Sequence, residues 1–304
     1  MKKAKRNIYF FLFSIVSLTI FWEHLGILTS LSLLRGHAGE LYSHFLLIPV
    51  ISAYFFWIQR REIWKDYQYC LGIGVAVIAG GALCYLLGIR YRSVLNNNDY
   101  LSLVMLGTVI WFMGGFILFY GLKAFKRAIF PLAFLFFMVP IPTFILDPYV
   151  SALQKASAEV SYFIFKMTGV PIYRDGFTFE LSGITVHVAR ECSGIRSSIA
   201  LFITAVLAGY MFLETTWRRL VLILSSFPIA VIKNAFRIVT ISLLASYVDK
   251  VFITNHWLHR SGGLPFFIIG MVLFFLPLLL LLKISEKKRM VRGIVAKKEA
   301  ASIH

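Results

Sequence analysis

The stretch LVLILSSFPIAVIKNAFRIVTISLLASY, Leu220–Tyr247, decides the fold class of this protein. A helix needs about 20 apolar residues to cross the hydrocarbon core of a bilayer. This run exceeds that length and carries only two charges, Lys233 and Arg237. Comparable apolar runs recur along all 304 residues, of which 59% are apolar and 15% charged. Because about a quarter of the residues in soluble domains are charged, the sequence predicts a polytopic membrane protein.

Hydropathy predicts an all-α membrane protein with about eight transmembrane helices in a single integral membrane domain, residues 1–304. The expected spans are Ile8–Trp22, His44–Ile58, Leu71–Ile89, Leu101–Gly121, Ala128–Leu146, Gly194–Leu213, Leu220–Tyr247 and Gly263–Leu282. The basic segment before the first span resembles the start of a signal peptide. No small-residue cleavage site follows that span, so we expect an uncleaved helix. Residues 283–304 are expected to form a basic cytoplasmic tail.

The net charge is +17, and the distribution of the basic residues along the chain indicates the membrane topology. An even number of spans places both termini on one side, and the short segments on that side hold 19 of the 31 Lys and Arg residues. Because positive residues are enriched in cytoplasmic loops, both termini are expected in the cytoplasm. This distribution argues against a nucleic-acid partner, since loops and a tail account for the charge.

The segment Pro140–Glu191, between the fifth and sixth spans, is expected to lie outside the cytoplasm and to be partly irregular. Pro140 and Pro142 must interrupt any helix, and Ala152–Lys166 then has the apolar spacing of a helix at the membrane interface. Beyond it, apolar residues alternate on both sides of Ser182-Gly183: Phe177, Phe179, Leu181, Ile184, Val186 and Val188. This pattern favours a β-hairpin over an extended loop.

Three reactive side chains are expected at one depth near the outer membrane surface. Cys192 precedes the sixth span and His259 precedes the eighth, so both lie at outer helix ends. Arg237 lies 17 residues into the seventh span. At about 1.5 Å per residue, this places it roughly 25 Å from the cytoplasmic end, in the outer part of the bilayer core.

Cys192 has neighbours that suit a nucleophile, whereas Cys70 and Cys84 sit in an apolar helix and are expected to be small core residues. Arg190, Arg196 and the start of a helix supply positive potential that favours the thiolate. No CxxC pair or metal-ligand spacing occurs, so neither a metal nor a cofactor is expected.

Arg237 and Lys233 share one helical face inside a span, with Asn234 beside them. A cation there costs about 2.5–3.5 kcal/mol even on the lenient insertion scale, so it indicates a function or a buried partner. Asp147, Asp249 and Glu191 are the carboxylates that could provide such a partner. His256 rivals His259 as an outer histidine, and spacing alone does not choose between the two.

Together these residues predict a site for acyl transfer, in which a thiolate attacks a carbonyl, a histidine moves protons and an arginine stabilises negative charge. A transporter or channel that binds an anionic solute through Arg237 and Lys233 is the main alternative, but it gives Cys192 no role. A thiol acyltransferase and a non-catalytic assembly protein are further alternatives.

Several blocks of the chain resemble the exosortase/archaeosortase family. The three signature-like blocks are ECSGIRSS (Glu191–Ser198), KNAFRIVTISLLASY (Lys233–Tyr247) and LHRSGGLPFF (Leu258–Phe267). Supporting blocks lie upstream at Tyr42–Arg61, Phe130–Pro142 and Gly169–Gly176. The resemblance covers residues from about Tyr42 to Leu282, and the histidine at the third block is typical of a bacterial exosortase.

This resemblance implies a cysteine transpeptidase or protease of the bacterial cytoplasmic membrane. Such enzymes cleave a C-terminal signal from secreted proteins, made of a short motif such as Pro-Glu-Pro, a transmembrane helix and a basic cluster. The resemblance assigns Cys192 as the nucleophile, Arg237 as the stabilising cation and His259, rather than His256, as the third residue. The side chains expected to support this site or bind substrate are Lys233, Asn234, Glu191, Arg196 and His44. Exported tailed proteins and membrane lipids are the expected partners.

Overall fold

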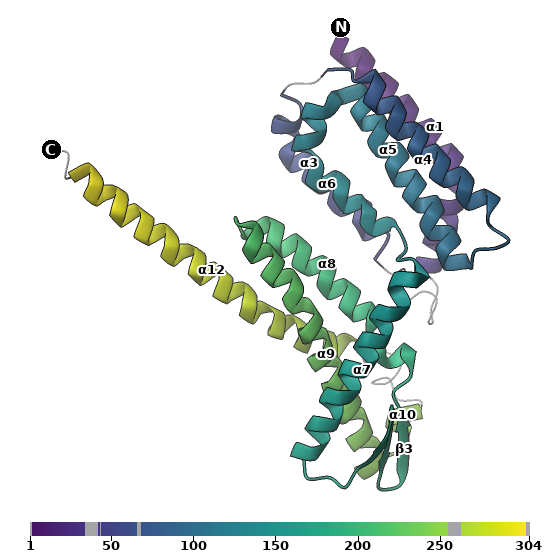
Figure 1. Cartoon of the computed structure of the whole chain (residues 1–304), viewed down its shortest axis with the longest axis vertical. Helices are drawn as coiled ribbons and strands as arrows, with labels where there is room; N and C mark the ends of the chain where they lie inside the picture. Colours follow the sequence, from purple (N-terminus) through teal and green to yellow (C-terminus); the bar gives the residue numbers. More distant parts are fainter. Residues whose placement is uncertain (1, 34–41, 43, 66–67, 255–262, 302–304) are drawn as a thin grey trace. The chain divides into compact units, whose positions relative to one another are not determined.

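A computed structural model describes residues 2–33, 42, 44–65, 68–254 and 263–301 of the chain (Figure 1). These residues are mostly helical and form two compact units, Met1–Asp147 and Pro148–His304. Each unit is described by itself below. The predicted all-α membrane fold is confirmed.

The first unit is built from helices α1, α3, α4, α5 and α6. α1, α4 and α5 lie side by side, and α4 and α5 pack as an antiparallel pair (Figure 1). The bounds are α1 Lys2–Leu33, α3 Leu47–Ile63, α4 Leu71–Arg90, α5 Asn97–Arg127, α6 Ile129–Phe134 and the 3-10 helix η1 Leu135–Met138. α1 continues past the first expected span, which ends at Trp22, as far as Leu33.

Glycines spaced seven residues apart let α4 and α5 approach closely. Gly74, Gly81 and Gly88 are buried along one side of α4, and Gly107 and Gly114 are buried in α5. A Cβ on Gly81 would lie 2.5 Å from the backbone nitrogen of Trp111. Small residues at such positions allow helix backbones to touch in a membrane, where close packing drives association. The period of seven is visible in the sequence, but hydropathy alone does not reveal it.

Replacing Gly81 by alanine is expected to destabilise the α4–α5 pair, because the new methyl group must push Trp111 and its helix away. Overpacking of this kind costs about 1–3 kcal/mol of unfolding free energy. Gly80→Ala is the matched control, since a Cβ at Gly80 meets nothing within 4 Å. Thermal unfolding in detergent should show a lower midpoint for Gly81→Ala and an unchanged or higher midpoint for Gly80→Ala. Equal midpoints for the two variants would contradict this packing.

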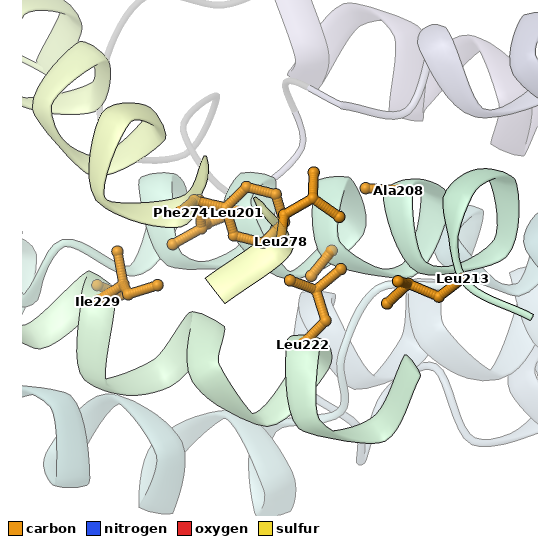
Figure 2. Close-up of a cluster of buried hydrophobic side chains, with 9 residues drawn as sticks. Leu201, Ala208, Leu213, Leu222, Ile229, Phe274 and Leu278 are labelled. Carbon is orange, nitrogen blue, oxygen red and sulfur yellow. The ribbon is translucent and has the colours of Figure 1, made fainter. Parts of the chain in front are cut away.

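The second unit contains α7, a three-stranded sheet and the helices α8, α9, α10 and α12. The bounds are α7 Thr143–Met167, β1 Tyr173–Asp175, β2 Thr178–Leu181, β3 Ile184–His187, η2 Arg190–Ser193, α8 Ile195–Phe212, α9 Thr216–Tyr247, α10 Val251–Thr254 and α12 Gly263–Ala301. α7 thus begins within the last residues of the first unit. Side chains of α8, α9 and α12 meet in the apolar cluster of Figure 2, where Leu201, Leu222 and Phe274 are almost fully buried. This cluster packs the three helices together.

The predicted hairpin is confirmed as β2 and β3, joined by a turn in which Gly183 has a φ of 81°. A third strand, β1, pairs antiparallel with β2 and was not predicted from the sequence. Phe179 and Leu181 of β2 are buried against α7 and α9, in a cluster that includes Phe165 and Val239. The sheet therefore rests on α7 and α9, and its last strand leads to Cys192.

Six helices are long and apolar enough to cross a membrane among the residues described. They are Lys5–Leu33, Leu71–Arg90, Asn97–Arg127, Ile195–Phe212, Thr216–Tyr247 and Pro265–Ile284, and a bent pair, Ile129–Met138 with Thr143–Met167, would make a seventh. The sequence predicts about eight. α3, in place of the expected span His44–Ile58, has 17 residues and is not among these six helices.

The expected span Ala128–Leu146 is broken rather than continuous. Helix η1 ends at Met138 and α7 begins at Thr143, with Pro140 and Pro142 in the break. Proline removes a backbone donor and disfavours helix at the residue before it, which explains the break. The helix expected over Ala152–Lys166 is the later part of α7.

Candidate active site

Cys192 lies in a short turn between β3 and α8. We call residues Arg190–Gly194 the cysteine turn: the 3-10 helix Arg190–Ser193 followed by Gly194. The backbone N–H of Cys192 donates to the carbonyl of Ala189 at 3.0 Å. Gly194 has φ 78° and ψ 22°, a left-handed conformation that glycine adopts without steric cost. The turn ends there, α8 starts at Ile195, and the side chain of Cys192 is half-buried.

Asn234 of α9 holds this turn directly. Its side-chain Nδ2 donates to the carbonyl of Cys192 at 2.9 Å and to Ser157 Oγ of α7 at 3.1 Å. Asn234 is 0% exposed, and a Cβ on Gly194 would lie 2.9 Å from its Oδ1. A larger residue at position 194 would therefore meet both backbone strain and a steric clash.

Lys233 contacts the helix that follows the turn. Its Nζ donates to Ser197 Oγ, and the Ser197 hydroxyl in turn donates to the carbonyl of Gly194 at 2.9 Å. Lys233 is buried, and its aliphatic stem lies against Gly270 of α12, where a Cβ would be 3.1 Å from Cδ. Two neighbouring residues of α9 thus contact the two ends of the segment from Cys192 to Ser197.

Polar side chains on α7 contact the segments on either side of the cysteine turn. These residues were not predicted from the sequence. Gln154 Nε2 donates to the carbonyl of Val188 at 2.6 Å, just before the cysteine turn. The hydroxyl groups of Tyr149 and Ser198 form a short hydrogen bond. Gln154, Ser157 and Ser161 are buried at helical spacing within an apolar helix. That spacing is the signal that could have identified the polar face of α7.

Arg237 lies on the same face of α9, three residues beyond Asn234 and four beyond Lys233, and is half-buried. The structure therefore brings Lys233 and Asn234 into contact with the segment from Cys192 to Ser197, with Arg237 one helical turn further. Arg196 lies in the first turn of α8 and is exposed.

The remaining expected site residues lie outside the described residues or in the first unit. His259 and His256 lie outside the described residues, as does the side chain of Glu191. His44 lies in the first unit, in the turn before α3, and is half-buried with its ring beside Phe45. Within the described part of the chain, no group of three or more His, Cys, Asp or Glu side chains could hold a metal ion.

These features define a polytopic helical membrane protein whose half-buried cysteine sits between a β-hairpin and an apolar helix. A family model described as transmembrane exosortase (Exosortase_EpsH) matches residues 36–276, and the chain belongs to that family. No curated protein and no solved structure matches the chain. Exosortases are membrane peptidase-like enzymes, so membership supports a role as a membrane enzyme in protein sorting.

Proposed function

We propose that this protein is a cysteine transpeptidase or protease that removes a C-terminal sorting signal from secreted proteins. The substrates are exported proteins whose tail combines a short motif of the Pro-Glu-Pro type, a transmembrane helix and a basic cluster. The observation that carries the proposal is the position of Cys192, half-buried on a turn that Asn234 and Gly194 fix against α9.

The proposed reaction passes through a thioester at Cys192. The thiolate attacks the scissile peptide carbonyl, the C–N bond breaks, and His259 gives a proton to the leaving amine. Arg237 stabilises the thiolate and the developing oxyanion. Water or an acceptor amine then attacks the thioester, loses a proton to His259 and releases Cys192. The location of Arg237 one turn beyond Asn234 supports its assignment.

Supporting roles are proposed for the remaining residues. The contact of buried Lys233 with Ser197 favours a part in holding the start of α8. Arg196 adds positive potential near the turn, and Glu191 and His44 are proposed to assist substrate binding.

The protein is proposed to lie in the bacterial cytoplasmic membrane, with both termini in the cytoplasm and the site on the outer face. The support is the bias of Lys and Arg toward the loops on the side of the termini. Exported substrates reach the outer face after translocation, and the proposed orientation presents Cys192 to them there.

Co-expression with a tailed secreted protein tests the proposed function. Intact-mass spectrometry of the exported protein should show loss of the C-terminal helix and basic cluster when this protein is present. The matched control is the same substrate with its short motif scrambled, which should keep its full mass. If several tailed substrates keep their full mass in the presence of the protein, the proposed function is wrong.

A further inference from the structure

The amide of Asn234 makes a contact that the acyl-transfer chemistry does not itself use. The helical hydrogen bonds of α8 begin at Gly194, whose carbonyl accepts from the N–H of Ser198 at 3.0 Å. The carbonyl of Cys192 lies before these bonds. A side chain from another helix, Asn234, donates to it at 2.9 Å.

The orientation of the Asn234 amide is fixed by its partners. A carbonyl oxygen only accepts, so the group that faces Cys192 O must be the NH₂ group of Asn234. Its second hydrogen goes to Ser157 Oγ at 3.1 Å. A flipped amide would place Oδ1 against the carbonyl of Cys192 with two acceptors in contact. No residue without a side-chain NH₂ group can make both bonds.

The oxygen of the Asn234 amide restricts which residue can occupy position 194 of the cysteine turn. Oδ1 is buried, has no hydrogen-bond partner among the described residues, and lies 2.9 Å from the position that a Cβ of residue 194 would take. One side chain that is 0% exposed thus bonds the Cys192 carbonyl and leaves no room for a Cβ at residue 194. A rotation of the Cys192 peptide, which would redirect its thiol, must break this contact.

We propose that Asn234 is a positioning residue that fixes the direction of the Cys192 thiol through the peptide carbonyl of the same residue. It acts through Cys192 rather than on the substrate, and the inference rests on the proposed function of Cys192 as a nucleophile. A displacement of about 1 Å at a reacting group can lower a rate about 100-fold. Asn234→Ala should therefore lower kcat for processing by about 10- to 100-fold and change KM by less than about threefold.

Asn234→Asp separates positioning from a general packing role. Aspartate has nearly the same shape, but its ionised form places only acceptors against Cys192 O, whereas its protonated form can donate again. Acidic pH should therefore partly restore the contact. The ratio of the Asn234→Asp rate to the wild-type rate should rise as the pH falls from about 8 to about 5, because protonation gives the new carboxyl a donor for Cys192 O.

The experiment uses the full chain in a Cys70→Ala/Cys84→Ala background, so that Cys192 is the single thiol. Two readouts are taken: the rate of Cys192 alkylation by a maleimide over this pH range, and the kinetics of substrate processing. Ser242→Ala is the control, since Ser242 is buried in α9 and its hydroxyl donates within that helix, to Ile238 O. It should stay within about twofold of wild type in both readouts.

The alkylation arm needs no substrate, so it separates failure of this inference from failure of the proposed function. A changed rate of Cys192 alkylation in the Asn234 variants would support the positioning role. Substrate processing by Cys192→Ala would refute the proposed function but would leave this support for positioning intact. Wild-type alkylation and kcat in Asn234→Ala, or a pH-independent Asn234→Asp ratio, would overturn the positioning role.

If Asn234→Ala does not fold, the Ser157→Ala variant tests the positioning role instead. It removes one of the two acceptors of the amide and should slow processing by about two- to fivefold, and no change would overturn the role.

Discussion

Cys192→Ala is expected to reduce signal removal by at least about 10³-fold, because the thioester route loses its nucleophile. Cys192→Ser should be nearly as inactive, since a hydroxyl is a far weaker nucleophile than a thiolate. Both substitutions are small and the side chain is only half-buried, so thermal unfolding should remain close to wild type. The measurement is the rate at which a tailed substrate is truncated, read by mass spectrometry.

The same variants distinguish an enzyme from a transporter. A transporter that binds anions through Arg237 and Lys233 should keep its activity in Cys192→Ser, because the thiol has no part in binding the solute. Cys84→Ala is the matched control: Cys84 lies in α4 of the first unit and should tolerate the change. Full processing by Cys192→Ala, with the protein folded in the membrane, would refute the assignment of the nucleophile.

Arg237→Ala is expected to lower kcat by about 10²- to 10³-fold, the usual effect of removing a group that stabilises developing negative charge. Arg237→Lys should fall between this variant and wild type, because it keeps the charge but loses the planar pair of donors. Single-turnover kinetics on a purified substrate measure the effect. KM should change less than kcat if the cation acts mainly in the transition state.

Arg219→Lys is the matched control for Arg237→Lys. Arg219 lies near the start of the same helix, where its Nε donates to the carbonyl of Leu213 at 2.8 Å and its guanidinium stacks on Tyr210. It is about 27 Å from Arg237 along the helix axis. A similar loss of activity in both variants would indicate damage to α9 and would contradict a specific role for Arg237.

The parts of the fold that depend on local pattern could be predicted from the sequence. Alternating apolar residues around Ser182-Gly183 predicted the hairpin, and the long apolar runs predicted the membrane class. Strand β1 was missed because three residues, Tyr173–Asp175, are too few to show a period of two.

The sequence could indicate candidate residues of the site, including Asn234, but not the contacts between them. Cys192, Lys233 and Arg237 could be identified because their surroundings are unusual. Cys192 is a thiol among charged residues, and the other two are cations inside a membrane span. The side chains of α7 that support the turn, Gln154 and Ser157, are ordinary polar residues whose importance depends on contacts across helices. The pairing of Asn234 with the carbonyl of Cys192 is likewise a tertiary contact, which no sequence spacing encodes.

A covalent adduct is the direct signature of the proposed chemistry at Cys192. With hydroxylamine present during the reaction, a thioester should be intercepted, and the substrate should acquire a hydroxamate at its new C-terminus. In a parallel reaction without hydroxylamine, stopped with acid, the peptide containing Cys192 should carry the mass of the substrate fragment that precedes the cleavage site. A product with only a free carboxylate in hydroxylamine, together with an unmodified Cys192 peptide or an adduct on another residue such as Ser197, would contradict a thioester at Cys192.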